Sequence, residues 1–489
     1  MKFLFAPILS GILFLAGTAP LAGAPVTVVV DAQAPGLPIA ANFTGLSFEV
    51  SQLLPNPAGV RYFRPDNAPL INLFHTLGIR SLRIGGNTSD RDARQLPATA
   101  DLDSLFAFAR AADVKIIYCL RLHGGDPAAA TQTVKYIMSH YPDQMDCFSI
   151  GQEPSAYPKE IADDRPAAER MGVAAEKYPY TAYADEWRKF EIAITAVVPG
   201  VKLCGPSVHN NAAWAQQFIT DFSHGHNVGL ITEHLYPGGA GGKVPTPEIG
   251  RDRMLSTNFT HAYEKLYHGF VPLAASNGLP CRLEEVNNYF NGGATNVSNT
   301  FAAALWGLDF MYWWAAHGVA GVNFHTGDQV AAGNELRASK YTAFYTATNG
   351  FSVRPLGYGI KAFAIGSNGK LLPAVITNAE NLNLSLYPVK DEAGHLSLTI
   401  INKEHGDGAR SATVSIDETH AYSGRGHLML LTAPAQDPAA TEGETLGDGT
   451  IEADGSWAGH WTLVDPSSTG TFTVEVPACS AVILKLSAN

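Results

Sequence analysis

Two short segments of this chain end on residues that can act as acids, bases or nucleophiles. The first is Ser149–Pro154 and the second is Arg282–Asn287. Each segment is typical of a β-strand whose apolar residues stop at a glutamate. Two carboxylates presented at strand ends over one cleft are the groups that break a glycosidic bond. The rest of the chain must therefore form a fold that brings these two strand ends together.

Glu153 is the candidate general acid/base in the first segment. Pro154 follows it, and proline cannot continue a β-ladder, so the strand stops and its last side chain points into the cleft. There it would protonate the leaving oxygen and later deprotonate the incoming water. The alternative is a solvated glutamate at a strand end, with no catalytic role.

Glu285 is the candidate nucleophile in the second segment, and its neighbour Glu284 competes with it. Successive strand residues face opposite ways, so alternation alone does not choose between the two. A nucleophile must stay ionised and needs a cation and hydrogen-bond donors nearby. Arg83 and Tyr236, on two other strand-like segments, are the candidate supports. The alternative for Arg83 is a structural ion pair inside the fold.

Four more polar residues lie at the ends of strand-like runs, and they are Glu49, Asn87, His234 and His325. Any one of them alone is more often a hydrogen-bonded structural group than a sugar ligand. Together, however, they would surround one mouth of a barrel. This arrangement favours a polar binding site around the two carboxylates.

Between residues 43 and 350, apolar strand-like runs alternate with helical patterns. The expected strands are Gly45–Val50, Ser81–Gly85, Lys115–Arg121, Cys147–Glu153, Lys202–Pro206, Leu230–Tyr236, Cys281–Val286 and Gly321–His325. The expected helical segments are Pro69–Leu77, Leu102–Ala112, Ala128–His140, Ala184–Val198, Ala213–Phe222, Met254–Leu273, Thr300–Ala316 and, after the last strand, Tyr341–Asn349. This alternation predicts an α/β fold, a (β/α)8 TIM barrel. Catalytic residues of such barrels lie at C-terminal strand ends, where Glu153 and Glu285 fall on strands four and seven.

After Asn349 the pattern changes to short alternating runs separated by Gly, Asn and Asp, which predicts an all-β sandwich. The expected strands there are Leu371–Thr377, Leu396–Ile401, Ala412–Ile416, Gly426–Thr432, Gly470–Val476 and Ala481–Leu486. The segment Val26–Val30 is also strand-like and is expected to join this sandwich. We therefore expect residues 25–42 to join the sandwich, residues 43–350 to form the barrel, and residues 351–489 to form the sandwich domain.

Residues 1–24 have the pattern of a secretory signal peptide. Lys2 supplies the positive charge, Phe3–Ala16 the apolar stretch and Ala22–Ala24 the small-residue cleavage site. The alternative is a membrane anchor, but the apolar run is interrupted by Pro7 and is short for a membrane span. The sequence thus predicts a secreted or periplasmic protein that contacts no membrane after cleavage.

The composition excludes several classes of protein. With 46% hydrophobic and 16% charged residues among 489, the chain is globular and long enough for two domains. Its net charge of −12 argues against a nucleic-acid partner, whose phosphates require basic residues. The five cysteines show no CxxC pair and favour buried thiols, with a Cys119–Cys147 disulfide as the alternative. No residue spacing indicates a metal site or any other cofactor, and none sets an oligomeric state.

In combination, several segments resemble glycoside hydrolase family 79, the β-glucuronidase and heparanase family. The segments that carry the resemblance are Phe43–Glu49, Leu82–Asp90, Gly151–Pro154, Arg282–Asn287, Thr300–Trp306, Gly321–His325 and Ile401–Lys403. They are spread over the whole chain after residue 24. Each is weak alone, and the set is specific.

The resemblance implies retaining hydrolysis with Glu153 as acid/base and Glu285, not Glu284, as nucleophile. Retention through a glycosyl-enzyme intermediate requires carboxyl groups about 5–5.5 Å apart. By the same resemblance, Glu49 and Asn87 hold sugar hydroxyls, while Arg83 and Tyr236 support the nucleophile. His325 belongs to the predicted sugar-binding set.

The resemblance also suggests how a uronate would be held, and where this chain differs. The Gly292-Gly293 turn matches a stretch whose backbone amides receive the uronate carboxylate. Gln152 stands where most of the family has an asparagine that reaches the sugar 2-hydroxyl. A tyrosine of the carboxylate pocket is replaced by Phe290, with Tyr289 beside it as a candidate contact. Asp328 lies in the loop after strand eight, where its negative charge would repel a uronate carboxylate.

The first hypothesis is therefore a secreted, retaining, exo-acting β-glycosidase, with terminal β-glucuronic acid or a modified glucuronide as its substrate. One alternative keeps the mechanism and changes the sugar to a neutral or modified one. Another is an internally cleaving enzyme of the heparanase kind, although no Lys/Arg cluster accompanies the strand-end loops. A third is a carbohydrate-binding protein without catalysis. In every case the partner is a carbohydrate.

Overall fold

The computed structural model of the protein describes residues 24–90, 95–157, 178–225, 227–328, 330–332, 335–378, 380–416, 422, 424–468 and 470–488. The predicted signal segment, up to residue 23, therefore lies outside the described residues. In the described part of the chain, no helix is both long and apolar enough to cross a membrane.

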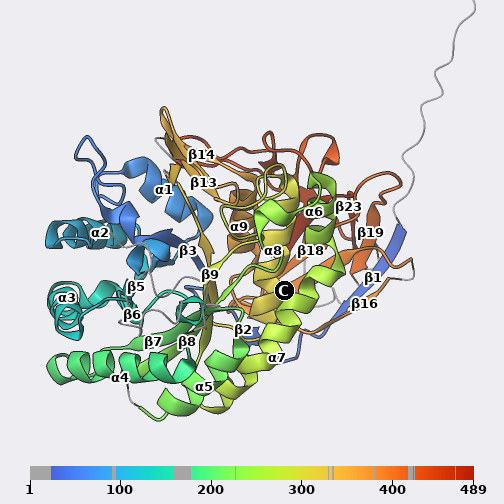
Figure 1. The fold of residues 1–489 in the computed structure, drawn as a ribbon. Coiled ribbons are helices and arrows are strands. Elements are labelled where there is room, and N and C mark those ends of the chain that lie inside the picture. Colours follow the sequence, from blue (N-terminus) through green and yellow to red (C-terminus); the bar gives the residue numbers. More distant parts are fainter. Residues whose placement is uncertain are drawn as a thin grey trace, which may run out of the picture.

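Eight parallel strands close into a barrel, which confirms the predicted fold class (Figure 1). In barrel order they are β3 (Thr44–Glu49), β4 (Ser81–Gly85), β5 (Lys115–Leu120), β6 (Met145–Ile150), β7 (Leu203–His209), β8 (Val228–Leu235), β9 (Cys281–Val286) and β10 (Gly321–His325), and β10 pairs again with β3. Helices cover the outside of the barrel and side chains fill its inside. The strands therefore read as nearly continuous apolar runs, which made them recognisable in the sequence.

Helices follow the strands around the barrel, as Figure 1 shows. They are α1 (Ala68–Leu77), α2 (Thr99–Ala111), α3 (Pro127–His140), α4 (Tyr180–Val197), α5 (Ala212–Phe222), α6 (Pro247–Leu255), α7 (Thr260–Ser276), α8 (Phe301–Ala316) and α9 (Pro355–Gly366). The long segment expected at Met254–Leu273 is divided between α6 and α7. Nearly every residue of α8 is buried. One side of this helix packs against the neighbouring elements of the barrel, and its other side lies near the sandwich.

The prediction of an eighth helix at Tyr341–Asn349 is wrong. The residues of this segment enter a hairpin of β13 (Phe344–Ala347) and β14 (Gly350–Val353), and α9 takes the place of the last barrel helix against α8 and α1. The segment is rich in aromatic residues and threonine, which favour strands. Gly350 at the turn has φ 137°, a conformation that a residue with a side chain rarely adopts.

Two further sheets pack face to face beside the barrel. The smaller sheet has the order β16 (Ala374–Thr377), β1 (Ala24–Val30), β19 (Ala412–Ile416) and β23 (Phe472–Val476). The larger sheet has the order β2 (Leu37–Pro38), β15 (Lys370–Leu371), β17 (Leu384–Lys390), β18 (Leu396–Asn402), β24 (Ser480–Leu486), β20 (Gly426–Thr432) and β21 (Thr445–Leu446), with β22 (Thr462–Val464) on β20. One more hairpin, β11 (Val330–Ala332) with β12 (Glu335–Arg337), follows the last barrel strand.

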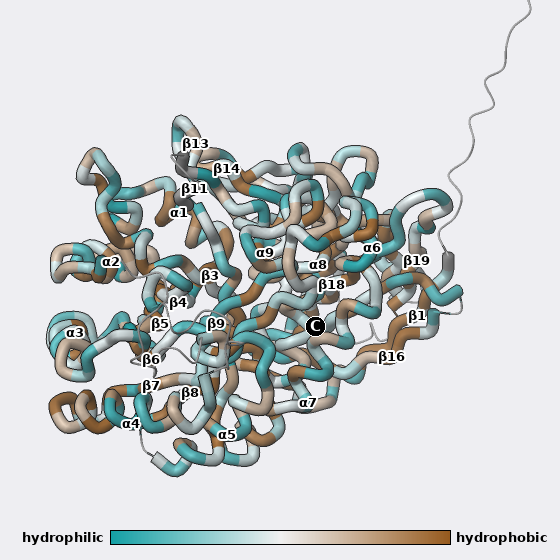
Figure 2. Tube along the Cα trace, viewed as in Figure 1, coloured by the Kyte–Doolittle hydropathy of each residue, from teal (hydrophilic) through white to brown (hydrophobic). Residues whose placement is uncertain are grey.

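The N-terminal strand joins the smaller sheet, as the sequence predicts, because β1 pairs with both β16 and β19. Figure 2 shows hydrophobic, brown stretches on β1 and β16, at the end of the molecule far from α2 and α3. Their buried side chains, such as Val28, form a core with Val414 and Leu484 between the two sheets. The opposite face of the larger sheet contributes Ile401 and Ile483 to the core of the barrel helices. The sandwich thus braces the barrel from one side.

All five cysteines are buried free thiols, as the sequence favours. The alternative disulfide between Cys119 and Cys147 is not formed. Cys147 instead lies against Cys204 of the adjacent strand β7, inside the barrel.

Candidate active site

Glu153 and Glu285 meet at the C-terminal mouth of the barrel. One carboxylate oxygen of each and one ring nitrogen of His234 all lie within 4.8 Å of one another. The two glutamates follow or end strands β6 and β9, which are separated by two other strands, so closure of the barrel is what brings them together. Their side chains keep 12% and 7% of their surface exposed at this mouth, for Glu153 and Glu285 respectively. A small molecule entering the barrel mouth would therefore meet both carboxylates.

The backbone after β6 turns sharply to deliver Glu153. Gly151 has φ 93°, and a Cβ atom there would lie 2.9 Å from the side chain of Leu122. Glu153 itself has φ 47°, in the left-handed region that non-glycine residues seldom occupy, and its amide donates to the Ser207 carbonyl at 2.9 Å. Strained conformations of this kind persist where surrounding contacts fix them, and they are frequent at functional sites.

A β-bulge in β9 explains why alternation could not choose between Glu284 and Glu285. Along β8, Glu233 pairs with Leu283 and the next residue, His234, pairs with Glu285, so Glu284 is an extra residue. The bulge turns both carboxylates into the barrel. Glu284 is fully buried, 4.0 Å from the Arg83 guanidinium, whereas Glu285 reaches the mouth. Only Glu285 is therefore placed to contact a ligand.

Three donors surround the carboxylate of Glu285. Arg83 donates to Oε2 at 2.7 Å, the Gln152 amide nitrogen donates to Oε2 at 3.0 Å, and the Tyr236 hydroxyl donates to Oε1 at 2.9 Å. Burial alone would raise the pKa of Glu285, but the charges of His325, His234 and Arg83 outweigh it and hold that pKa well below its ordinary value. The carboxylate is thus kept ionised, as a nucleophile requires.

Gln152 is fixed between two of these groups. Its side-chain oxygen accepts a hydrogen bond from Arg83, while its amide nitrogen donates to Glu285. Its backbone amide donates to buried Asp90 at 3.0 Å, and Asp90 also accepts from the Tyr157 hydroxyl. Burial raises the pKa of Asp90 to about 6.

His234 bridges the carboxylates from strand β8. Its Nδ1 lies 3.2 Å from Glu153 Oε1, and its Nε2 lies 3.6 Å from Glu284 Oε1. Burial would lower the pKa of His234, but the negative charges of Glu285, Glu153 and Glu284 raise it to about 9. The imidazole is therefore protonated at neutral pH and links the acid/base candidate to the nucleophile candidate.

Glu49 and His325 form a second pair at the mouth. The Thr88 amide and hydroxyl donate to Glu49 at 2.8 and 2.6 Å, and the Asn87 amide donates to it at 3.2 Å. His325 lies 3.6 Å from Glu49 and 3.9 Å from Glu285. Burial would lower the pKa of His325, but the charges of Glu285 and Glu49 raise it. The Asn87 side chain is exposed next to this pair.

The structure does not bring Tyr289 to this group. Its ring is fully buried, and its hydroxyl donates to the Gly250 carbonyl at 2.9 Å. Its neighbour Phe290 instead packs edge-on against Tyr236, with ring centroids 6.1 Å apart. The turn beyond it contains Gly292 and Gly293, whose φ angles of 79° and 83° require glycine.

Asp328 is buried and accepts hydrogen bonds from two residues. One carboxylate oxygen accepts hydrogen bonds from the Tyr62 hydroxyl at 3.0 Å, the Thr346 amide at 2.8 Å and the Thr346 hydroxyl at 2.6 Å. Asp328 therefore ties the loop after β10 to the loop after β3 and to the hairpin. One oxygen of the carboxylate that the sequence placed near a uronate is therefore engaged in these contacts.

His209 is a site residue that the sequence analysis missed. The expected strand ended at Pro206, but β7 continues to His209, whose ring packs edge-on against Tyr236 and Phe290 at 5.6 and 5.5 Å. Proline is rare inside strands, so the earlier end was expected. The signal that was available is the apolar Val208 after Pro206, which continues the buried pattern.

The chain was compared with known proteins, and no protein-family profile matches it. A β-glucuronidase of Aspergillus niger is 28% identical over 158 residues, which are 30% of this chain and 29% of that enzyme. The chain therefore matches less than a third of the length of this relative. The identity of this segment is too low, and the segment too short, to show the family.

Several solved structures that the chain resembles are barrel glycosidases. A 4-O-α-L-rhamnosyl-β-D-glucuronidase of Fusarium oxysporum covers 94% of this chain and all of its own, with a TM-score of 0.71 at 17% identity. A family 51 α-L-arabinofuranosidase of Bifidobacterium longum covers 94% of this chain and 99% of its own, with a TM-score of 0.64 at 16% identity. These matches show that the fold is that of a TIM-barrel enzyme with accompanying β-sheets.

Replacing His234 should move the pH profile of the site toward alkaline pH. The variant His234→Gln removes a cation that lowers the pKa values of Glu153 and Glu285, so both should rise. The acidic limb of kcat/KM reports ionisation of the nucleophile and the alkaline limb reports the protonated acid. Both limbs are expected at higher pH than in the wild type, measured from kcat/KM against pH on an aryl glycoside.

The matched control is His75→Gln, on the exposed face of α1. It should leave both limbs in place. A profile of His234→Gln that is lower but unmoved would contradict the role of His234 in setting these pKa values.

Proposed function

We propose that the protein is a retaining, exo-acting β-glycosidase of the glycoside hydrolase family 79 type, with terminal β-linked glucuronic acid as its substrate. The observation that carries the proposal is the pair Glu153 and Glu285 at the mouth of the barrel, with oxygens within 4.8 Å. Retaining enzymes hold the two carboxyl groups about 5–5.5 Å apart, while inverting enzymes leave about 6.5–9.5 Å for a water molecule. The observed separation supports retention.

In the first step, Glu285 attacks the anomeric carbon and forms a covalent glycosyl-enzyme. The bond to the leaving oxygen breaks as Glu153 gives that oxygen its proton. In the second step, Glu153 removes a proton from water, and the water oxygen displaces Glu285 from the anomeric carbon. Two inversions return the β-configuration.

The charges around the site fit the role of Glu153 as the base of the second step. The described cluster has four carboxyl groups next to Arg83, His234 and His325, and they belong to Glu49, Glu153, Glu284 and Glu285. Burial and the charge of Glu285 raise the pKa of Glu153, whereas His234 lowers it, so that it lies below its ordinary value in the empty site. A glycosylated Glu285 loses its charge, which favours ionised Glu153 as the base of the second step.

The turn at Gly292 and Gly293 supports a carboxylate-bearing sugar. Among the described residues, none accepts a hydrogen bond from the backbone amides of these two glycines. Successive amides in a left-handed turn form a concave surface suited to an anion. A uronate carboxylate would receive these two donors next to Tyr236 and Phe290. The Aspergillus relative and the Fusarium structure are both named as glucuronidases, which agrees with this substrate.

The function is tested with a panel of 4-nitrophenyl β-glycosides: glucuronide, 4-O-methylglucuronide, glucoside, galactoside and xyloside. We expect the highest kcat/KM for a glucuronide, because only the uronates carry the anion that the glycine amides would bind. Proton NMR during turnover should show the β-anomer as the first product. Preference for the glucoside would contradict the uronate as substrate but not the retaining mechanism. An initial α-anomer would contradict retention.

We also propose that the protein is exported, because residues 1–24 have the pattern of a signal peptide. Mass spectrometry of the exported protein should find its N-terminus at Pro25. Recovery of the intact N-terminus from a membrane fraction would favour the anchor instead.

A further inference from the structure

Five polar atoms of the barrel strands have no hydrogen-bond partner among the described residues. They are Arg83 Nε, Ser149 Oγ, His234 Nε2 and the two carboxylate oxygens of Glu284. All four side chains are fully buried and come from strands β4, β6, β8 and β9. Buried polar groups of folded proteins are nearly always paired, so a set of unpaired atoms inside one barrel requires an explanation.

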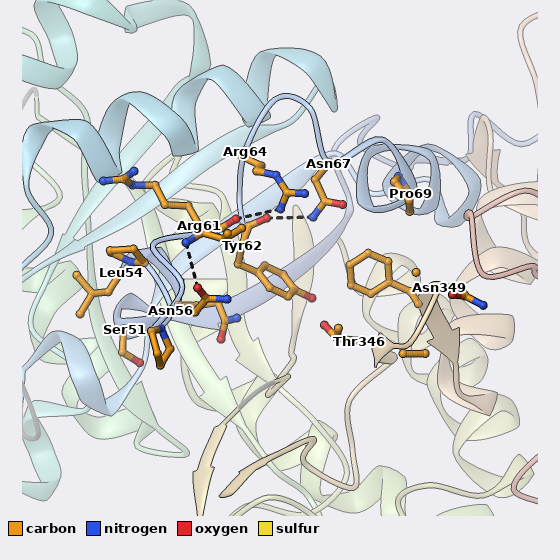
Figure 3. Close-up of a pocket in the computed structure, with 17 residues that line it drawn as sticks. Ser51, Leu54, Asn56, Arg61, Tyr62, Arg64, Asn67, Pro69, Thr346 and Asn349 are labelled. Carbon is orange, nitrogen blue, oxygen red and sulfur yellow. Dashed lines mark hydrogen bonds between the residues drawn. The ribbon is translucent and has the colours of Figure 1, made fainter.

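Polar groups at the rim of the barrel, by contrast, find partners within the chain. A cavity of about 500 Å³ lies there between the loop after β3 and the β13–β14 hairpin (Figure 3). In its wall, Arg64 donates to the Arg61 carbonyl at 3.3 Å, and Asn67 donates to the Tyr62 carbonyl at 3.1 Å. The unpaired atoms inside the barrel need a partner of another kind.

Arg83 and His234 each keep one N–H group that no described residue accepts. The two terminal nitrogens of Arg83 are engaged, one with Glu285 at 2.7 Å and the other with Gln152, so its Nε–H remains. Nδ1 of His234 lies 3.2 Å from Glu153, so its Nε2–H remains. Two cationic groups therefore have one buried donor each to satisfy.

The carboxylate of Glu284 faces both donors at distances too long for direct hydrogen bonds. His234 Nε2 lies 3.6 Å from Oε1, and Arg83 Nε lies 4.0 Å from Oε2. Direct N–H···O bonds are about 2.7–3.2 Å long. A water molecule can accept hydrogen bonds from both N–H groups and donate to the carboxylate. These partners match the two to four hydrogen bonds that a buried water usually makes.

The charges that face His234 favour its doubly protonated form. Burial would lower the pKa of His234, and the Arg83 guanidinium acts in the same direction. The carboxylates of Glu285, Glu153 and Glu284 outweigh them and raise this pKa to about 9. Burial would raise the pKa of Glu284, but His234 and Arg83 hold it below its ordinary value. Glu284 is therefore a charged neighbour of the ring.

Two further titratable residues lie next to His234. Glu233 points to the opposite face of β8, where it is fully buried and accepts from the Asn211 amide at 3.2 Å. Burial raises the pKa of Glu233 well above its ordinary value, so this residue adds no charge at neutral pH. His209 pairs with His234 across to β7, and its ring packs against Tyr236.

We propose that Glu284 is a positioning residue that, with a buried water molecule shared between Arg83 and His234, keeps both ring nitrogens of His234 protonated. His234 then remains a cation through both steps of the reaction, and as a cation it lowers the pKa values of Glu153 and Glu285. Glu284 thus acts on the reaction without touching the sugar. The proposal rests on the proposed function for the roles of Glu153 and Glu285, but the charge of His234 is measured without it.

The test follows the ring nitrogens of ¹⁵N-labelled histidine by NMR against pH, in the whole protein and without substrate. The signals of His234 are identified by their loss in His234→Gln. In the wild type they should titrate with a pKa of about 9. In Glu284→Gln this pKa should fall by about 1–3 pH units, because a nearby opposite charge is lost. Glu284→Asp keeps the charge and should keep most of the elevation.

The matched control is Glu233→Gln, which replaces a buried glutamate next to His234 that is already neutral. It should leave the pKa of His234 in place. An unchanged pKa in Glu284→Gln, or an equal fall in both glutamine variants, would overturn the role of Glu284. Titration of wild-type His234 near its ordinary value of about 6.5 would overturn it without any variant.

The water molecule is tested by a crystal structure of the wild type in which ordered solvent is visible. A water within hydrogen-bond distance of Arg83 Nε, His234 Nε2 and Glu284 is expected. Direct contact between Glu284 and both donors, with no water among them, would overturn this part of the proposal. Failure of the proposed function would appear separately, as absence of turnover on every nitrophenyl glycoside, because the titration of His234 needs no substrate.

Discussion

Glu285→Gln is expected to lose turnover by a factor on the order of 10⁴ or more, with its fold intact. The amide has nearly the shape of the carboxylate but cannot form the glycosyl-enzyme. It also removes the negative charge that Arg83, Gln152 and Tyr236 now surround. The measurement is kcat on 4-nitrophenyl β-glucuronide, together with the unfolding midpoint of the variant.

The matched control for this prediction is Glu284→Gln, one residue earlier on the same strand. Glu284 is fully buried behind the bulge and does not reach the mouth, so its amide variant should lose far less activity than Glu285→Gln. If the two variants exchanged these outcomes, the nucleophile would be assigned to the wrong residue. Ordinary turnover by Glu285→Gln would show that Glu285 is not the nucleophile.

The barrel could be predicted because its strands carry a simple signal. Strands buried on both faces, such as β4 and β9, appear as short apolar runs between helices, and the ranges expected for these two match the structure residue for residue. The two glutamates proposed as catalytic were recognisable because a carboxylate at or near a strand end interrupts such a run. The strand expected to end at Glu153 ends at Ile150 instead, and the turn that follows it delivers the Glu153 side chain.

The β13–β14 hairpin could not be predicted from the same kind of signal. The segment at Tyr341–Asn349 has apolar residues at spacings that suit either a helix or a strand, and its short length leaves the two unresolved. The contact that selects the strand is distant in the sequence, because Thr346 binds Asp328 and Asp328 binds Tyr62. Contacts of this range have no local pattern.

The contacts around Glu285, the proposed nucleophile, could be predicted only in part, for a related reason. A bulge depends on how β8 and β9 align, and the sequence of β9 alone contains Glu284 and Glu285 as equals. Likewise, nothing in the segment around Gln152 indicates that its side chain spans from Arg83 to Glu285. These contacts depend on how three strands are placed relative to one another. The sequence identifies the residues, but it does not show which of them contact each other.

Glu153→Ala is expected to show a loss of activity that depends on the leaving group. A general acid contributes about 10²–10⁴-fold when the departing oxygen needs a proton. A 2,4-dinitrophenolate leaves without one, so its glycosylation step should be almost unaffected, while an alkyl glucuronide should lose the full factor. The measurement is kcat/KM across aryl and alkyl glucuronides plotted against leaving-group pKa, which should be much steeper for the variant than for the wild type.

The second step gives this prediction an independent readout. Without the base at position 153, water attacks the glycosyl-enzyme slowly, so that dinitrophenyl glucuronide should give a burst of phenolate followed by a slow steady state. Azide needs no base and should restore turnover, with a β-glucuronosyl azide as product, because it enters through the position of the missing carboxylate opposite Glu285. His234, which now lies 3.2 Å from Glu153, would remain to hold the variant site together. A loss of equal size for every leaving group, without azide rescue, would mean that Glu153 only supports the structure and that the proton comes from another residue.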